Sequence, residues 1–287
     1  MQNDKINFSL IIPIGLMLFS FFFGAGNLIF PPVLGQMAGD NIGWGMLGFC
    51  LSGVGFPLLG VLAMAMKQSD NPDSIAMPMH PLYARAVTIL CALAIGPLFA
   101  IPRTAAVSFD TGIHSLLPAS CEAIGLPVYT VFFFVLTYFF SINPSKIIGH
   151  IGKFLSPMLL ICLAVLVVCV FVNPTGSLKM PNPDFAASPF FRGFQEGYNT
   201  MDLLAAILFG SITIKAIEAQ GITDKKVLTK LCSYAGVIAA FFLAIIYAAL
   251  AYTGALSINI FGVIPNGATL LSKICTYYMG FGGQIVL

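Results

Sequence analysis

The sequence predicts an all-α integral membrane protein folded as a multi-span helical bundle, and three observations support this fold class. Hydrophobic residues make up 58% of the 287 residues and charged residues only 8%, whereas soluble domains carry about 25% charged residues. The mean hydropathy is +0.94. Apolar segments long enough to cross a bilayer recur along the chain. This composition cannot cover a water-facing surface, so soluble globular, disordered and coiled-coil proteins are excluded.

The net charge and the cysteines exclude further classes of ligand. A formal charge of +2 leaves no basic face for nucleic acid, so nucleic acid is not an expected partner. The seven cysteines show no CxxC spacing and no pairing with histidine, and most lie in apolar runs. We interpret them as small core residues rather than metal ligands or disulfides, and expect no resident cofactor.

Seven apolar segments are predicted to cross the membrane as helices. A helix needs roughly 20 residues, at about 1.5 Å each, to cross a hydrocarbon core about 30 Å thick. A β-barrel would show alternating segments of about ten residues, whereas residues 155–172 are continuously apolar. The first segment exceeds the roughly 7 to 15 residues of a signal-peptide core, so we expect it to stay attached. The predicted spans are Phe8 to Leu34, Ile42 to Met66, Tyr83 to Phe109, Leu126 to Ile142, Phe154 to Val172, Thr200 to Ala219 and Leu231 to Leu256.

The distribution of lysine and arginine predicts a cytoplasmic amino-terminus. In this orientation nine basic residues lie in inside loops and three lie outside, as the positive-inside rule requires. The inside residues are Lys5, Lys67, Arg85, Lys146, Lys153, Lys215, Lys225, Lys226 and Lys230, and the outside residues are Lys179, Arg192 and Lys273.

The first span contains strong helix breakers at membrane depth, namely Gly24, Gly26, Asn27 and the pair Pro31-Pro32. A break within the hydrocarbon is stable only where protein, water, an ion or a substrate satisfies the freed backbone groups. One interpretation is that the glycines permit close packing and the prolines end the helix. The other is a discontinuous helix whose second half begins near Gly26. Its N–H groups would then face an anion, and carbonyls of the unwound turn would face a cation.

The sixth span carries small and polar residues at its middle, with Gly210 next to Ser211. Spans one and six correspond if the fold repeats every five helices, and breaks at corresponding positions indicate a transporter built from inverted repeats. Packing of Gly210 against a neighbour is the alternative. We therefore predict a 5+5 inverted-repeat transporter fold over residues 1–287, as a single but incomplete transmembrane domain. Residues 1–173 would form the first repeat, and residues 174–287 a partial second repeat with spans six and seven and the start of an eighth.

Three charged residues within spans require an interpretation. Arg103 is expected in the outer third of span three, where it gates the site or pairs with Asp110, because an arginine at the bilayer centre is costly unless it is paired or near water. Snorkelling to the interface is the alternative. Asp202, near one end of span six, is interpreted as an interface residue.

A stripe of small residues in span two is expected to let another helix approach closely. It consists of Gly45, Gly48, Ser52 and Gly55, at spacings of three and four.

Several segments resemble the bacterial branched-chain amino acid:cation symporters. They are GAGNLIFPP at 24–32, GVGFPLLGV at 53–61, GPLFAIPRTA at 96–105 and Asn143-Pro144. The resemblance implies about twelve spans on the leucine-transporter-like fold, so this chain would be truncated at its carboxyl end. It also implies symport of leucine, isoleucine and valine into the cell across the bacterial inner membrane, driven by a cation gradient. Spans one and six carry no carboxylate or histidine at their middle, which favours Na⁺ as the coupling ion, with H⁺ as the alternative. A symporter is not an enzyme, and its implied partners are the amino acid and the lipid bilayer, with no obligatory protein partner for the complete protein.

The resemblance also implies roles for residues at both breaks. The N–H groups of Ala25 and Gly26 would bind the substrate carboxylate, and Phe209-Gly210 is similar to an unwound turn whose aromatic ring closes over the substrate. The implied substrate-binding residues are Gly24, Ala25, Gly26, Leu203, Ala206, Ile207, Leu208, Phe209 and Gly210. The implied sodium ligands are carbonyls of Ser20 and Phe23 at one site, and the Phe22 carbonyl and Asn27 amide oxygen at another.

Other classes fit the sequence less well. A non-transporting truncated membrane protein stays open as an alternative. A seven-helix receptor is disfavoured because the charge bias places the seventh span's end outside. The sequence contains no HExxH or GxSxG motif of an intramembrane enzyme and no TVGYG filter of a channel.

Overall fold

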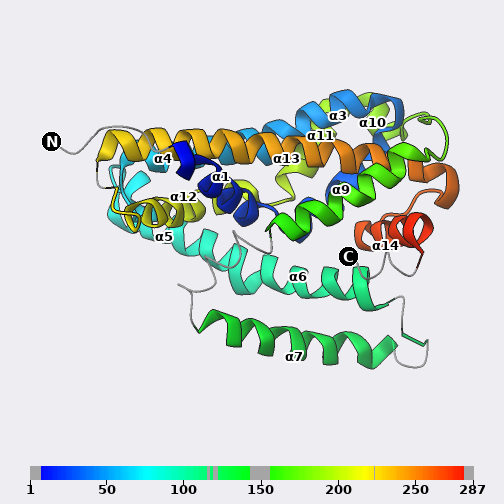
Figure 1. The fold of residues 1–287 in the computed structure, drawn as a ribbon, viewed down its shortest axis with the longest axis horizontal. Helices are drawn as coiled ribbons and strands as arrows, with labels where there is room; N and C mark the ends of the chain where they lie inside the picture. The colour runs from blue at the N-terminus through cyan, green and yellow to red at the C-terminus, as the bar shows by residue number, and fades with distance from the viewer. Residues whose placement is uncertain (1–7, 115–116, 119–121, 143–155, 223, 281–287) are drawn as a thin grey trace.

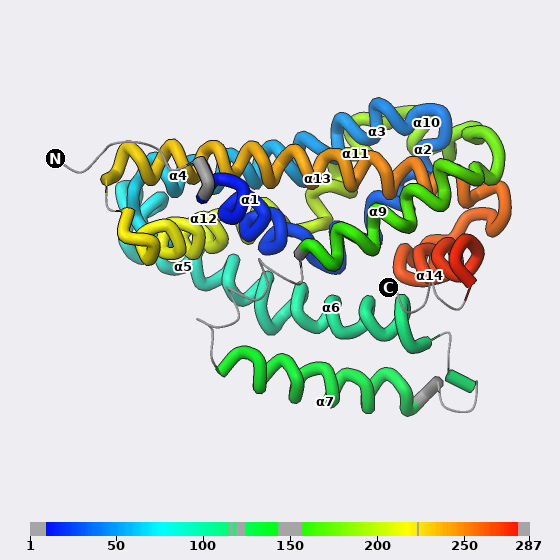
Figure 2. Tube along the Cα trace, viewed as in Figure 1, coloured from blue at the N-terminus to red at the C-terminus, as the bar shows by residue number. Residues whose placement is uncertain are grey.

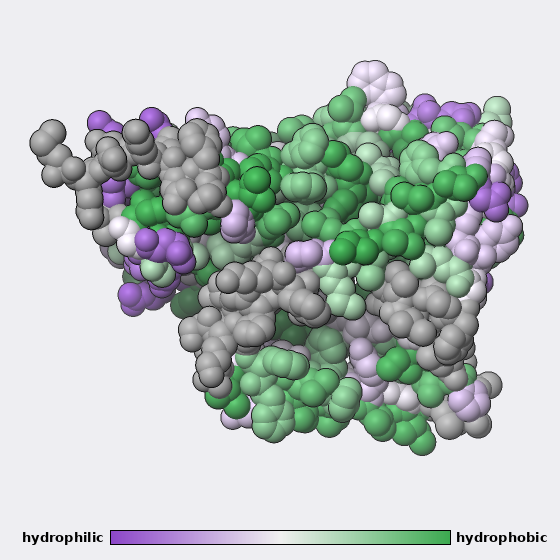
Figure 3. Space-filling view, viewed as in Figure 1, coloured by the Kyte–Doolittle hydropathy of each residue, from purple (hydrophilic) through white to green (hydrophobic). Residues whose placement is uncertain are grey.

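The computed structural model describes residues 8–114, 117–118, 122–142, 156–222 and 224–280, and within these ranges the chain forms helices and turns without a strand (Figures 1 and 2). Among the described residues, four helices are long and apolar enough to cross a membrane, or five if one bent pair counts as a single span. Hydrophobic residues cover the middle of the face drawn in Figure 3, and hydrophilic residues gather toward its two ends. The predicted all-α membrane fold is confirmed.

The first predicted span is two helices, α1 (Phe8–Phe22) and α2 (Ala25–Ala38). Gly24 has an extended backbone, with φ −112° and ψ −172°, so the helical hydrogen-bond ladder is interrupted there. The pair Pro31-Pro32 lies inside α2, which continues to Ala38. The interpretation that these prolines end the helix is therefore wrong, and the discontinuous helix is the observed arrangement.

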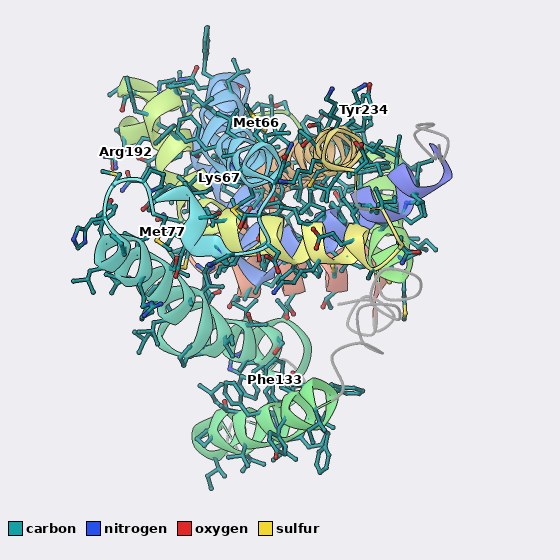
Figure 4. The ribbon with its side chains drawn as sticks, turned by 90° about the vertical axis from the view of Figure 1, so that its left-hand side faces the viewer. Met66, Lys67, Met77, Phe133, Arg192 and Tyr234 are labelled. Atoms are coloured by element: carbon teal, nitrogen blue, oxygen red, sulfur yellow. The ribbon has the colours of Figure 1, made fainter. Side chains whose placement is uncertain are left out.

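The second span consists of α3 (Ile42–Cys50), a π-helical stretch (Leu51–Gly55) and α4 (Phe56–Lys67). The third consists of α5 (Pro81–Leu93), a π-helical stretch (Ala94–Leu98), α6 (Ala100–Ser108) and a second π-helical stretch (Phe109–Ile113). The fourth is α7 (Glu122–Ser141), which packs on α6. Figure 4 shows α7, with its residue Phe133, at the edge of the molecule.

The later helices follow the predicted order. They are α9 (Ser156–Val172), α10 (Pro183–Ala187), α11 (Pro189–Tyr198), α12 (Asp202–Glu218), α13 (Lys225–Phe261) and α14 (Gly267–Met279). Helices α11 and α12 form the bent pair, with an angle of 46° between them.

The break in the sixth span lies at 199–201, before the predicted position. Helix α12 runs unbroken through Gly210 and Ser211. A Cβ on Gly210 would lie 3.0 Å from Cβ of Met64, so this glycine serves the packing of α12 on α4. The prediction of an unwound turn at Phe209-Gly210 is therefore wrong.

Helix α13 runs along the upper part of the molecule in Figure 1 and packs along α2, α1 and α4. Its contact with α2 is close because Gly35 lies against the Ala251 carbonyl and Gly254 against the Pro32 carbonyl. Tyr247 is fully buried at the middle of this core. Thus α13 fixes the position of α2, the second half of the first broken helix.

The predicted glycine stripe of span two packs against α11. A Cβ on Gly48 would collide with the Phe190 carbonyl, and one on Gly193 with the Gly45 carbonyl. Ser52 Oγ donates a hydrogen bond to the Phe194 carbonyl at 2.7 Å. The predicted close approach of another helix is confirmed, and it fixes the position of α11, which leads into the second break.

Several predictions fall outside the described residues and receive no structural account. They concern Asn143-Pro144, Lys5, Lys146, Lys153, Cys121 and the start of the eighth span at 281–287. The other six cysteines are free thiols.

Candidate functional site

The two broken helices meet at a cavity of about 90 Å³. Both breaks contribute to its lining, together with residues of the third span. The lining residues are Phe21, Phe22, Gly24, Ala25, Gly26, Asn27, Ile95, Ala100, Arg103, Thr104, Thr200, Met201, Asp202, Ala205 and Phe209. The structure therefore brings together segments from three spans that are far apart in the sequence.

Asn27 satisfies the backbone at the first break. Its Oδ1 accepts a hydrogen bond from the Gly24 N–H at 3.1 Å. The first N–H groups of a helix have no partner within the helix, and they carry the positive end of its dipole. In α2 these groups belong to Ala25 and Gly26, which line the cavity. This half helix thus presents a positive end to the cavity.

Arg103 donates hydrogen bonds to the backbone carbonyls at the second break. Its Nη1 donates to the Asn199 carbonyl at 3.0 Å and its Nη2 to the Thr200 carbonyl at 3.4 Å. Met201 has a left-handed backbone, with φ 69°, and forms the corner between α11 and α12. Carbonyl groups freed within a span need such a donor, because lipid supplies none.

The Arg103 side chain lies between two aromatic rings. Its guanidinium carbon is 5.5 Å from the centre of the Phe30 ring and 5.8 Å from that of Phe99, within the range of cation–π attraction. The predicted partner, Asp110, instead accepts a hydrogen bond from Asn266 Nδ2 at 3.4 Å. The predicted pairing of Arg103 with Asp110 is therefore wrong, because the break at α11 takes up the guanidinium.

Asp202 is a buried carboxylate at the start of α12, with an exposed fraction of 5%. Its Oδ2 accepts a hydrogen bond from Asn27 Nδ2 at 2.5 Å and another from the Tyr247 hydroxyl at 3.3 Å. Asn27 Nδ2 also hydrogen-bonds the Tyr247 hydroxyl oxygen. A buried carboxylate needs such donors, and the positive end of α12 supports it as well. The interpretation of Asp202 as an interface residue is wrong.

Aromatic side chains form the apolar part of the site. The Phe209 ring centre lies 5.5 Å from that of Phe21 and 5.4 Å from that of Phe22, so α12 and α1 meet through these rings. Ile95 and Ala100 contribute further apolar surface from the third span. The cavity thus has polar groups at the breaks and apolar groups beside them.

The predicted substrate residues divide between the cavity and other surroundings. Gly24, Ala25, Gly26 and Phe209 line the cavity. The other predicted residues of the sixth span, Leu203, Ala206, Ile207, Leu208 and Gly210, do not line it.

Helix periodicity explains this division. Residues 202, 205 and 209 share one face of α12, and this is the face that lines the cavity. Ala206 lies instead against Gly60 of α4, and Ile207 and Leu208 line a separate small cavity beside α5.

The predicted sodium ligands lie at the end of α1 and the start of α2. Helix α1 ends at Phe22, and the last carbonyls of a helix have no partner within the helix. Ser20 Oγ donates to the Leu16 carbonyl at 2.7 Å. Phe22 and Asn27 line the cavity, whereas Ser20 and Phe23 do not.

Sequence reasoning missed the roles of Thr200, Met201, Asp202 and Tyr247. One signal was present, because Asp202 and Phe209 are seven residues apart and therefore share a helix face. Tyr247 gave no local signal, since it lies in a long, uninterrupted apolar helix that contains no proline.

Comparison with known proteins identifies the family of this chain. The family model described as "Branched-chain amino acid transport protein" matches residues 8–287. The chain is 45% identical, over 100% of its length, to the branched-chain amino acid permease BrnQ of Bacillus subtilis. It is 44% identical over 96% of its length to the permease BraB of the same organism, and 37% identical over 96% to BrnQ of Escherichia coli K12. No solved structure matches.

The matched region makes up a larger share of this chain than of each relative. The chain spans 65% of the length of Bacillus subtilis BrnQ and 62% of the length of each of the other two. By the match of the family model over residues 8–287, the chain belongs to the branched-chain amino acid transport protein family.

Proposed function

We propose that the protein acts in the secondary active transport of leucine, isoleucine and valine into the cell, driven by a cation gradient. The observation that carries the proposal is the meeting of two broken helices at one cavity with a positive helix end, buried polar groups and an apolar aromatic wall. Broken helices that line a cavity at membrane depth are typical of transporter binding sites. The names of the relatives as branched-chain amino acid permeases agree with this substrate class.

We propose Na⁺ as the coupling ion, held by carbonyls at the end of α1. Helix α1 ends beside the cavity, and hard cations prefer oxygen ligands. The sequence argument for Na⁺ was that spans one and six carry no carboxylate at their middle. The buried position of Asp202 at the second break weakens that argument, so the ion has to be tested directly. Moving one charge through 100 mV is worth about 2.3 kcal/mol, or roughly fiftyfold accumulation.

The proposed setting is the bacterial inner membrane, with a cytoplasmic amino-terminus, residues 1–173 as a first inverted repeat of five spans and residues 174–287 as part of the second. Lys67 ends α4, and Lys215, near the end of α12, pairs at 3.6 Å with Asp70, which follows Lys67 by three residues. Figure 4 looks onto the end of the molecule that carries Lys67. A basic end agrees with a cytoplasmic face.

Uptake into proteoliposomes tests the function and the ion separately. The chain would be reconstituted and supplied with radiolabelled leucine under an inward Na⁺ gradient, an inward proton gradient, both or neither. We expect accumulation that requires the Na⁺ gradient and is abolished by an ionophore that dissipates it. Accumulation that ignores Na⁺ but collapses with the proton gradient would overturn sodium coupling alone. Absence of leucine uptake under every gradient would overturn the proposed function.

A further inference from the structure

The cavity carries one side chain of each charge. Arg103 and Asp202 are the only charged residues among the described residues that line it. They do not form a direct ion pair, because the guanidinium donates to the carbonyls at Asn199 and Thr200 while the carboxylate accepts from Asn27. The two opposite charges therefore lie on the same cavity, each held in place by other groups.

Two positive groups converge on one side of the cavity. A Cβ on Gly26 would lie 2.8 Å from Arg103 Nη2, so the guanidinium rests against the first turn of α2. This turn is the positive end of a helix dipole, which repels a cation and attracts an anion. Arg103 Nε is also buried with no acceptor among the described residues, so the hydrogen bonds of this arginine are incomplete. An anion bound between the two positive groups would remove their repulsion.

The negative group is fixed by three helices. Asp202 on α12 is held by Asn27 from α2 and by Tyr247 from α13. Its other nearby charge is Arg103, whose positive charge acts on it across the site. These hydrogen bonds fix the carboxylate at the cavity wall, where it is the negative group that a cationic part of a ligand would meet.

We infer that the cavity binds its substrate as a zwitterion, with Arg103 and the first N–H groups of α2 on the α-carboxylate and Asp202 on the α-ammonium. This inference rests on the proposed function and adds to it the residues that bind the carboxylate and the ammonium group of the amino acid. A ligand that carries both charges can reach both groups because they line the same cavity, and the aromatic wall beside them receives its side chain. Charge-assisted hydrogen bonds of this kind are roughly twice as strong as neutral ones.

Binding of substrate analogues that lack one charge tests the inference. The purified chain in nanodiscs would be titrated with L-leucine, with L-leucinamide, which lacks the carboxylate, and with 4-methylpentanoate, which lacks the ammonium. For Arg103→Gln we expect leucine affinity to fall at least about tenfold while leucinamide affinity is unchanged. For Asp202→Asn we expect leucine affinity to fall while 4-methylpentanoate affinity is unchanged.

A matched control and a conservative variant separate binding from folding. Arg192→Gln removes an exposed arginine of α11 that pairs with Asp184 at 3.7 Å, and should leave all three affinities unchanged. Arg103→Lys keeps the positive charge and should recover part of the leucine affinity that Arg103→Gln loses.

The outcomes separate the two proposals. Equal losses for leucine and leucinamide in Arg103→Gln would assign this arginine to the support of the second break alone, and would overturn the inference. If the unaltered chain binds no leucine in the presence of NaCl, the proposed function itself fails. If leucine binds the unaltered chain, Arg103→Gln and Asp202→Asn with the same affinity, the inference alone fails.

Discussion

Asn27 Nδ2 and Asp202 Oδ2 lie 2.5 Å apart and join the two broken helices directly. The same asparagine accepts from the Gly24 N–H at the first break, so one side chain completes that break and holds the carboxylate at the second. The two breaks therefore form a single hydrogen-bonded unit. A substitution at one break should alter the hydrogen bonds of the other.

Asn27→Ala should lower the free energy of unfolding by about 2–4 kcal/mol, because it removes the acceptor of Gly24 and a donor of the buried Asp202. Thermal unfolding in detergent measures the loss. The control is Asn71→Ala, which removes the cap of an exposed turn and should cost about 1 kcal/mol or less. Equal losses in the two variants would contradict the proposed unit.

Tyr247→Phe should lower stability by about 1–2 kcal/mol, because the buried hydroxyl donates to Asp202. The ring should stay in place, since it packs edge-on against Phe49 with centres 5.2 Å apart. The matched control on the same helix is Tyr234→Phe, whose side chain is exposed at the surface (Figure 4) and should change stability by about 0.5 kcal/mol or less. A Tyr247→Phe variant as stable as the control would show that the hydroxyl contributes nothing to the stability of the protein.

Gly26→Ala should weaken leucine binding at least about tenfold, because the added Cβ would lie 2.8 Å from Arg103 Nη2 and displace the guanidinium. Gly26 itself has an ordinary helical position, so any loss of stability should come from the displaced guanidinium, which supports the carbonyls of the second break. Gly43→Ala, where no atom lies within 4 Å of the added Cβ, is the control and should bind leucine normally. Gly26→Leu should abolish binding, and normal affinity in that variant would argue against α2 as the carboxylate site.

Gly48→Ala should lower stability by about 1–3 kcal/mol, because its Cβ would push against the backbone of α11 at Phe190. Gly55→Ala lies in the same stripe, but its Cβ would be 3.7 Å from its nearest neighbours, so it should stay within about 0.5 kcal/mol. Thermal unfolding of the two variants tests whether the close approach of α3 and α11 depends on Gly48. A Gly48→Ala protein as stable as Gly55→Ala would refute that dependence.

The sequence was sufficient to locate the first break but not the second. Gly24 and Gly26 interrupt an apolar run where nothing else explains them, and the helix does end beside them. In the sixth span the conspicuous residue, Gly210, serves packing against α4. The real corner uses Met201, whose left-handed backbone no methionine favours by itself, so the surrounding structure determines it.

The sequence also could not predict which residues far apart in the chain would become hydrogen-bond partners. Arg103 was expected to pair with Asp110, seven residues away, because local spacing is all that a sequence displays. Its acceptors at Asn199 and Thr200 are 96 and 97 residues away and become neighbours only once α6 packs near the second break. The fold class required only composition and segment length, whereas the side chains that complete the site depend on tertiary packing.

The hydrogen bond between Asn27 and Tyr247 also bears on biosynthesis. These residues are 220 positions apart, and a ribosome adds roughly 5–20 residues per second, so some 10 to 45 seconds separate their synthesis. Asp202 is 175 positions from Asn27 and is added earlier, but until Tyr247 follows, the asparagine of the first broken helix lacks one of its two side-chain partners. The polar groups at the first break therefore need other hydrogen-bond partners during translation, because lipid supplies none.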